Sequence, residues 1–282
     1  MIGSFQTGVS GLQQFQQELE VIGNNIANVN TAGYKGSHVE FADTFSQSLL
    51  NGANVLQVGT GVATAAINSS FTQGTINTTG TTTDLAISGS GYFLVRDTSS
   101  NTTYATRDGQ FTLDQNGYLQ TNAGMRVQGY TGAPPYTSAT PTADILIDAA
   151  SAIAAFDPTA PVGTKIANFS IDSFGQVNAR LDDGVNGVMA QVVLQDFTNP
   201  QALMKLGNNV YTWDTNAGPL AAPAAPRSGG LGQIYSGAIE TSNVDLSTEM
   251  TSMITAQRAF EANAKIVTTS DEILQTLVNL KR

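Results

Sequence analysis

Few residues of this chain have the type and spacing that catalysis requires. Asp182 and Asp183 could act as a general acid and base, but they are adjacent and precede a glycine, so a solvent-exposed turn with diverging side chains is expected. His38 is the only histidine, so it has no second histidine for a metal site or a triad, and a surface position is expected. The segment Gly89-Ser90-Gly91 lacks the third glycine and the following helix of a dinucleotide-binding loop. We therefore predict a protein that is not an enzyme and that has no cofactor and no metal.

The composition excludes several classes of protein. The chain has 282 residues, of which 22 are acidic and 12 are basic, for a net charge of −10. A nucleic-acid-binding protein normally presents a basic face, so no nucleic acid is expected as a partner. The absence of cysteine excludes a disulfide framework and a thiolate site. The first residues form no cleavable secretory signal, and no apolar run approaches the ~18 residues of a membrane span, so no membrane insertion is expected.

The surface is expected to be polar but weakly charged. Charged residues make up only 12% of the chain, against about 25% in a typical globular domain. Asn, Thr, Ser, Gln and Gly take their place. Such a surface repels identical copies little and suits their dense packing. An Asn- and Thr-rich β protein is a plainer interpretation of the same composition.

Apolar residues recur every seven positions at both ends of the chain. Such a repeat is the seam of a coiled coil, in which each apolar side chain fits against a facing helix. An amphipathic helix packed on a globular core has similar spacing and is the alternative. The strict period favours a seam between the two ends and with neighbouring molecules. The predicted assembly seam comprises Phe5, Leu12, Phe15, Leu19, Ile22, Ile26 and Val29 near the start, and Leu246, Met250, Met253, Phe260, Val267, Leu274 and Leu277 near the end.

These two stripes predict two helices. The first covers residues 4–30 and ends near Gly33, because glycine readily adopts the left-handed conformation that follows a helix. The second covers residues 243–282, which contain neither Gly nor Pro, with Ser242 or Asn243 as its N-cap.

The pattern between the helices is that of a β protein. Apolar and polar residues alternate through residues 76–227, and Asn116-Gly117 and Phe174-Gly175 predict turns between neighbouring strands. Residues 216–230 are rich in Pro, Ala and Gly and predict a linker.

The expected fold is a mostly β central domain with discontinuous N- and C-terminal α-helices that form a coiled-coil-like terminal domain. Within the segment after the first helix, Phe41 and Phe45 lie four apart and could share a short helical turn. The predicted domains are a terminal helical domain of residues 1–35 and 243–282, a connector of residues 36–75 and 228–242, and a β outer domain of residues 76–227.

Five segments resemble the signatures of bacterial flagellar rod and hook proteins. Residues 21–35 (VIGNNIANVNTAGYK) resemble the N-terminal signature, and residues 237–245 (GAIETSNVD) and 253–263 (MITAQRAFEAN) resemble the C-terminal one. Residues 84–93 (DLAISGSGYF) and 107–111 (RDGQF) match the central β domain of that family. The likeness covers nearly the whole chain, and motifs of this length are specific.

The resemblance implies an axial structural protein. Such proteins leave the cell unfolded through the flagellar type III export apparatus, without a cleaved signal, and polymerise into a hollow helical tube. The paired terminal helices would line the channel, and the β domain would form the outer wall. An Asn-rich turn would join the two, because short amide side chains bond the backbone locally and stop the helix. This signature turn comprises Asn24, Asn25, Asn28, Asn30, Thr31, Gly33 and Tyr34.

Within the family, residues 41–45 (FADTF) and 277–282 (LVNLKR) resemble the hook protein. We therefore predict a subunit of the flagellar hook, which transmits torque from rod to filament and lies outside the cell after export. The implied partners are copies of the chain itself and the rod, hook-cap and hook–filament junction proteins. Hook proteins usually carry a further outer domain for which this chain is too short, and its length suits the distal rod. A distal rod subunit of the basal body is therefore the alternative.

Overall fold

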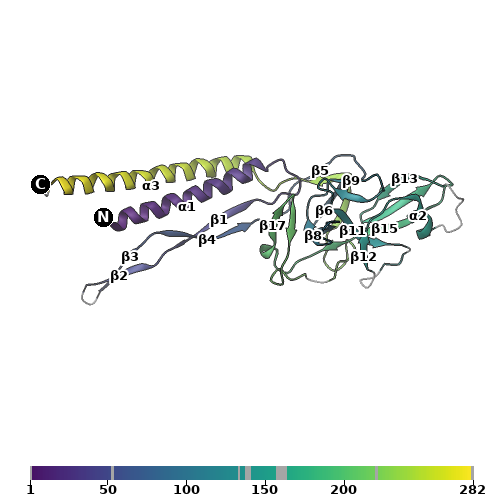
Figure 1. Cartoon of the computed structure of the whole chain (residues 1–282), viewed down its shortest axis with the longest axis horizontal. Coiled ribbons are helices and arrows are strands. Elements are labelled where there is room, and N and C mark those ends of the chain that lie inside the picture. Colours follow the sequence, from purple (N-terminus) through teal and green to yellow (C-terminus); the bar gives the residue numbers. More distant parts are fainter. Residues whose placement is uncertain are drawn as a thin grey trace. The chain divides into compact units, whose positions relative to one another are not determined.

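The computed structural model describes residues 2–51, 54–132, 134–136, 141–156, 164–219 and 222–280. It is mostly β, with long helices in its first and last segments (Figure 1). The chain divides into two compact units. The helical unit comprises Met1–Val29, Lys35–Ser70 and Val244–Arg282, and the β unit comprises Asn30–Tyr34 and Phe71–Asn243. Most of the predicted connector 36–75 lies in the helical unit, whereas residues 228–242 lie in the β unit.

Two helices dominate the helical unit. Helix α1 (Ile2–Ala27) and helix α3 (Leu246–Leu280) pack against each other (Figure 1). The apolar period of both segments explains this pairing, because each helix has one stripe to bury. The predicted end of the first helix near Gly33 is wrong, because α1 already ends at Ala27.

The start of α3 also differs from the prediction. Asp245, and not Ser242 or Asn243, is the capping residue: its Oδ1 accepts a hydrogen bond from the Thr248 backbone N–H at 3.0 Å. Hydrogen bonds from the backbone N–H groups of Thr248 and Ser247 lower the pKa of Asp245. A carboxylate suits this position because it also faces the positive end of the helix dipole.

Within the helical unit, the segment that follows α1 forms two antiparallel ribbons. Strand β1 (Ser37–Asp43) pairs with β4 (Val62–Ser69), and β2 (Ser46–Asn51) pairs with β3 (Asn54–Gly59). Helix α1 packs against β1 and β4 as well as against α3. The expectation of a helical turn through Phe41 and Phe45 is wrong. Phe41 lies in β1, where its ring meets the Phe15 ring edge-on at 5.9 Å between centroids.

The β unit is built around one large antiparallel sheet. Eight of its strands follow the order β13-β14-β15-β11-β7-β8-β18-β17. Two-stranded pairings of β19 with β6 and of β20 with β5 join the end of the unit to its beginning. The elements are β5 (Ile76–Thr78), β6 (Leu85–Ser88), β7 (Tyr92–Arg96), β8 (Thr103–Thr106), β9 (Phe111–Leu113), β10 (Leu119–Thr121), β11 (Arg126–Thr131), β12 (Thr142–Asp144), α2 (Ala149–Phe156), β13 (Ile166–Ile171), β14 (Gln176–Leu181), β15 (Asn186–Val192), β16 (Leu194–Gln195), a 3₁₀ turn (Pro200–Ala202), β17 (Met204–Gly207), β18 (Val210–Thr212), β19 (Gln233–Ser236) and β20 (Ala238–Glu240).

Both predicted turns between strands are confirmed. Strands β9 and β10 pair around Asn116-Gly117, and β13 and β14 pair around Phe174-Gly175. Helix α2 was not expected from the sequence. Asp148 caps it through a hydrogen bond from the Ser151 backbone N–H to Oδ1 at 2.7 Å.

The core of the β unit lies between the large sheet and the elements that cover it. The Phe93 and Phe111 rings meet edge-on at 5.2 Å inside the main apolar cluster, which also contains Leu119, Val192 and Ile234. The predicted linker at residues 216–230 is wrong where the structure describes it. Ala217 is fully buried, and Ala224 exchanges two backbone hydrogen bonds with Leu194.

Candidate self-assembly site

The two helices of the helical unit meet through small residues. Gly8 and Gly11 are buried on α1, and Ala256 and Ser270 are buried on α3. A β-carbon at Gly8 would lie 3.1 Å from Cγ2 of Val267, so the helix backbones approach closely there. Sequence reasoning missed the α3 side of this contact, although Ala256, Asn263 and Ser270 recur every seven residues. This row runs three residues behind the large apolar residues of α3, as the second seam position of a heptad does.

The large residues of the predicted assembly seam flank this small-residue contact. Ile22 is buried. Eight others are half-buried, namely Leu12, Phe15, Leu19, Ile26, Val29, Met253, Phe260 and Val267. Five remain exposed, namely Phe5, Leu246, Met250, Leu274 and Leu277. A role of these residues in assembly stays a prediction.

Helix α3 keeps a long apolar surface in solvent. Every residue from 271 to 280 is exposed. The exposed apolar side chains of α3 are Leu246, Met250, Ile254, Ile266, Ile273, Leu274, Leu277, Val278 and Leu280. So many exposed apolar side chains on one helix make α3 a candidate interaction site. Within the described residues, neither helix is long and apolar enough to cross a membrane.

Three asparagines of the signature turn organise the end of α1. The Asn28 side chain donates a hydrogen bond from Nδ2 to the Asn24 carbonyl at 2.9 Å, which occupies a carbonyl at the last turn. Asn25 is almost fully buried and holds Ser37 by two hydrogen bonds. Asn25 Nδ2 donates to the Ser37 carbonyl at 2.7 Å, and Oδ1 accepts from the Ser37 backbone N–H at 3.0 Å. The amide therefore pairs with Ser37 as a neighbouring strand would.

The rest of the signature turn belongs to the β unit. Gly33 has a φ of +66°, and a β-carbon there would lie 2.6 Å from the backbone nitrogen of Asp108. Only glycine meets both conditions. The Lys205 Nζ lies 4.9 Å from the centre of the Tyr34 ring, and burial lowers the pKa of Lys205. Asn209 donates a hydrogen bond from Nδ2 to the Ala32 carbonyl at 3.0 Å, and no sequence pattern pointed to this residue.

Thr31 and Asn30 complete the signature turn. The Thr31 carbonyl accepts a hydrogen bond from the Tyr34 backbone N–H at 3.3 Å. Asn30 is exposed.

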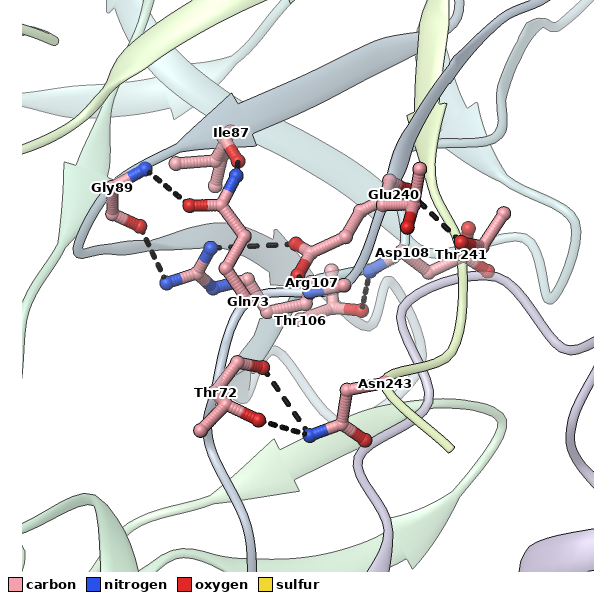
Figure 2. Close-up of polar contacts among 12 residues, drawn as sticks. Thr72, Gln73, Ile87, Gly89, Thr106, Arg107, Asp108, Glu240, Thr241 and Asn243 are labelled. Atoms are coloured by element: carbon pink, nitrogen blue, oxygen red, sulfur yellow. Dashed lines mark hydrogen bonds and ion pairs between the residues drawn. The ribbon is translucent and has the colours of Figure 1, made fainter. Parts of the chain in front are cut away.

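A buried polar network holds the end of the β unit (Figure 2). Glu240 and Arg107 are 1% and 6% exposed, and Oε2 of Glu240 lies 3.4 Å from Nη1 of Arg107. Oε1 of Glu240 accepts a hydrogen bond from the Gly74 backbone N–H at 2.8 Å. The Arg107 guanidinium also donates to the Gly89 carbonyl at 2.9 Å. Sequence reasoning did not select Glu240 or Arg107 as site residues, although both lie in the segments that resemble the family.

Two side-chain amides extend this network. Gln73 donates to the Ile87 carbonyl at 3.2 Å and accepts from the Gly89 backbone N–H at 3.0 Å (Figure 2). Asn243 Nδ2 donates to Oγ1 of Thr72 at 2.9 Å. The segment that leads out of the β unit is therefore fixed to the segment that leads into it.

Asp182, Asp183 and His38, the candidates for catalysis in the sequence, do not come together in an active site. Asp182 and Asp183 lie on an exposed turn, as expected. His38 is exposed in β1 and lies 3.4 Å from Oε1 of the exposed Glu40. A cavity of about 460 Å³ is lined by Arg96 and Asp144 among others. Its carboxylate is already bound, since Asp144 accepts hydrogen bonds from Arg96, Arg126 and Gln128. Among the described residues no cluster of three metal-ligating side chains occurs.

Three segments of the chain match known protein families. Residues 5–35 match the family described as flagella basal body rod protein. Residues 86–179 match the flagellar hook protein FlgE/F/G D1 domain, and residues 235–280 match the flagellar basal body rod FlgEFG protein C-terminal family.

Relatives match over the whole chain. The flagellar basal-body rod protein FlgG of Bacillus subtilis is 40% identical over 291 positions, with all of both chains covered. The FlgG protein of Caulobacter vibrioides is 33% identical, with 99% of each chain covered. The flagellar hook protein FlgE of Salmonella typhimurium is 28% identical over 412 positions, with 99% of this chain and 100% of the relative covered. Among solved structures, the Helicobacter pylori flagellar hook protein FlgE2 matches 58% of this chain with a TM-score of 0.44 and 9% identity.

Proposed function

The chain belongs to the family of flagellar rod and hook proteins, and we propose that within this family it is a subunit of the distal rod. Its relatives are structural components of the bacterial flagellum and not enzymes. The protein accordingly serves motility as a building block. We propose its place in the rod, its partners and its route of export.

One observation carries the choice of rod over hook. The match to the Bacillus subtilis rod protein spans 291 positions and covers both chains completely, so the two proteins have nearly the same length and order of segments. The match to the Salmonella typhimurium hook protein needs 412 positions, far more than the 282 residues of this chain, and its identity is lower. The hook predicted from the sequence is therefore less well supported than its alternative, the distal rod.

The surface of α3 supplies the driving force for assembly in this proposal. Its exposed apolar side chains would be covered by neighbouring copies of the chain. Burial of one such side chain contributes roughly 1.5–3 kcal/mol when it is complete. Several together offset the loss of freedom that ordering a subunit in a polymer costs. The low content of charged residues, 12%, keeps repulsion between adjacent copies small.

The network around Glu240 suits a part that transmits torque. A rod subunit must pass force between its segments without opening. Hydrogen bonds from Gly74 to Glu240 and from Asn243 to Thr72 fasten residues 72–74 to residues 240–243, and the buried pair of Arg107 and Glu240 lies beside them. We propose that copies of the chain, other rod proteins and the hook protein are its neighbours. Hook-cap and hook–filament junction proteins belong to the hook interpretation. The flagellar type III apparatus is the proposed route of export.

Imaging of basal bodies from cells that lack the gene tests the proposal. A distal rod subunit is required before any hook can form, so we expect shortened rods that carry no hook. Expression of the intact chain should restore both structures. Rods of normal length without hooks would instead identify the chain as a hook subunit. As a second measurement, polymers of the purified full-length chain should be straight, whereas a hook subunit forms curved tubes.

A further inference from the structure

Three separate segments of the β unit meet at Glu240. Its backbone carbonyl accepts a hydrogen bond from the Gly33 backbone N–H at 2.8 Å. Its side chain accepts a hydrogen bond from the Gly74 backbone N–H. It also pairs with the Arg107 guanidinium (Figure 2). Gly74 precedes Glu240 by 166 positions and Arg107 precedes it by 133. We infer that residues 233–243, the closing segment, control the folding of the β unit, which stays open around β5, β6 and Arg107 until Glu240 is in place.

Among the described strands, those of the closing segment supply the strand pairing of β5 and β6, although the Leu85 backbone N–H also donates a hydrogen bond to the Gly109 carbonyl. β19 pairs with β6 through four successive residues, and β20 pairs with β5 through three. Leu85, Ala86 and Ile87 of β6 are completely or almost completely buried, and so is Ile234 of β19. Without β19, the edge of β6 would leave its backbone groups unpaired next to the core, which is unfavourable.

The charge of Arg107 makes this dependence stronger. Its guanidinium is buried and lies 5.0 Å from the centre of the Tyr92 ring. The guanidinium donates one hydrogen bond to the Gly89 carbonyl, but a carbonyl does not neutralise its charge. Removal of one partner of a buried ion pair leaves an uncompensated charge and is strongly destabilising. Arg107 is therefore expected to stay in water until Glu240 arrives.

Other parts of the β unit need only nearby residues. β13 pairs with β14 across the short turn at Phe174-Gly175, and β14 pairs in turn with β15. Contacts between residues close in sequence form early, whereas contacts across a long loop must first overcome the entropy of closing it. On a chain delivered with its N-terminus first, the hairpins can form early. The region around β6 must wait for the closing segment, so a chain that has not yet emerged as far as residue 240 carries an incomplete β unit.

Pulsed hydrogen exchange during refolding of the unaltered full-length chain tests the inference directly. We expect peptides covering residues 166–192 to become protected first. Peptides covering β6 and peptides covering residues 233–240 should then become protected together in a later phase. Protection of β6 before residues 233–240 would overturn the inference, and so would simultaneous protection of the whole β unit.

Exchange of folded variants at equilibrium supplies a second test. In Glu240→Gln we expect exchange of the β6 amides to be faster by about tenfold or more, with β14 and β15 little changed. Asp144→Asn is the matched control, because it neutralises another buried carboxylate that pairs with arginine in the same unit. It should leave the protection of β6 within about twofold of the unaltered chain. Equal opening of β6 in both variants would contradict a special role for Glu240. Should Glu240→Gln fail to fold, the refolding experiment on the unaltered chain decides alone.

Discussion

A β-carbon added to Gly11 of α1 would stand 2.8 Å from Oδ1 of Asn263 on α3. Real β-carbons do not approach other atoms so closely, so the contact exists only because residue 11 has no side chain. Asn263 is held in turn by its own helix, since its Nδ2 donates to the Ala259 carbonyl at 2.9 Å. The spacing of α1 and α3 is thus fixed by a glycine facing an anchored amide.

Replacement of Gly11 by alanine should therefore cost stability that the same replacement at Gly23 does not. Both glycines lie inside α1, and alanine gains about 1 kcal/mol of helix propensity at either position. At Gly23 nothing lies within 4 Å of the added carbon, so the full gain is expected. At Gly11 a clash of about 1–3 kcal/mol opposes the gain. In urea unfolding followed by far-UV circular dichroism, the midpoint of Gly11→Ala should be lower than that of Gly23→Ala. Equal stabilisation by both would show that the close approach is not a constraint.

Gly33 is expected to tolerate alanine less well than another left-handed glycine of the β unit. Gly124 has a φ of +79° with open space around it, so Gly124→Ala should cost only the roughly 1–2 kcal/mol of the left-handed conformation. At Gly33 the added carbon would also meet the backbone of Arg107 and Asp108. Backbone cannot move aside as the end of a side chain can, so a larger loss is expected. Fluorescence of Trp213, the only tryptophan, reports unfolding of the β unit. Equal midpoints for the two variants would contradict this account.

The long helices could be predicted from the sequence because their apolar period extends over many turns. Their ends could not, since Ser242, Asn243 and Asp245 are all good capping residues in isolation. Only the structure shows that Asn243 binds Thr72 and that Asp245 is left to cap α3. The hairpin at Asn116-Gly117 was predictable because its turn signal is local.

The ribbons and the buried network could not be predicted from local sequence patterns. Strands β1 to β4 carry many Ser, Thr, Gln and Asn residues, so alternation of apolar and polar residues is weak there. Helix α2 has only eight residues and is nearly all apolar, which hides its period. The pairing of Arg107 with Glu240 joins positions 133 apart and leaves no periodic trace in the sequence.

Asn25 should not be replaceable by aspartate at neutral pH. Aspartate keeps the shape of the side chain but loses the donor that serves the Ser37 carbonyl, and its charge would face that carbonyl oxygen. Leaving such a buried group unsatisfied costs about 1–3 kcal/mol. Burial and this repulsion should raise the pKa of the new carboxyl, so the penalty exists above the raised pKa and shrinks as pH falls through it. The control is Asn24→Asp, because Asn24 is exposed and its Oδ1 accepts a hydrogen bond from Asn28 Nδ2, which a carboxylate can also accept. Urea midpoints of the helical unit should be measured at a series of pH values. As pH falls, the midpoint of Asn25→Asp should recover toward that of the unaltered chain, whereas Asn24→Asp should show no such recovery.

Asp144 should contribute to the loss of stability of the β unit in acid. Burial acts to raise the pKa of Asp144, but hydrogen bonds from Arg96, Gln128 and Arg126 outweigh it and lower the pKa. Because the folded-state pKa is the lower one, its contribution is complete above the unfolded-state value, which lies near pH 4. It is lost as pH falls through the folded-state pKa.

The Asp144→Asn variant should thus be less stable than the unaltered chain at neutral pH. On acidification it should lose less of its stability than the unaltered chain does. Trp213 fluorescence in urea between neutral pH and the acid range measures this slope. Asp182→Asn, a change at the exposed turn, should keep the full acid sensitivity of the unaltered chain. A slope for Asp144→Asn as steep as that of the unaltered chain would count against the ion pairs as its source.

Replacement of Leu277 should weaken assembly without changing the stability of the single chain. Its side chain is 44% exposed in a stretch of α3 where every residue is exposed. Leu277→Asp should therefore change the free energy of unfolding of the single chain by no more than about 0.5 kcal/mol. In the proposed polymer the same side chain is covered, and a charge there would be buried without a partner. The concentration needed for polymerisation, measured by sedimentation, should rise by about tenfold or more, since 1.4 kcal/mol corresponds to a factor of ten. Asn279→Asp adds the same charge two residues away at an exposed polar position and should polymerise nearly as the unaltered chain does. Normal assembly of Leu277→Asp would remove this residue from the assembly seam.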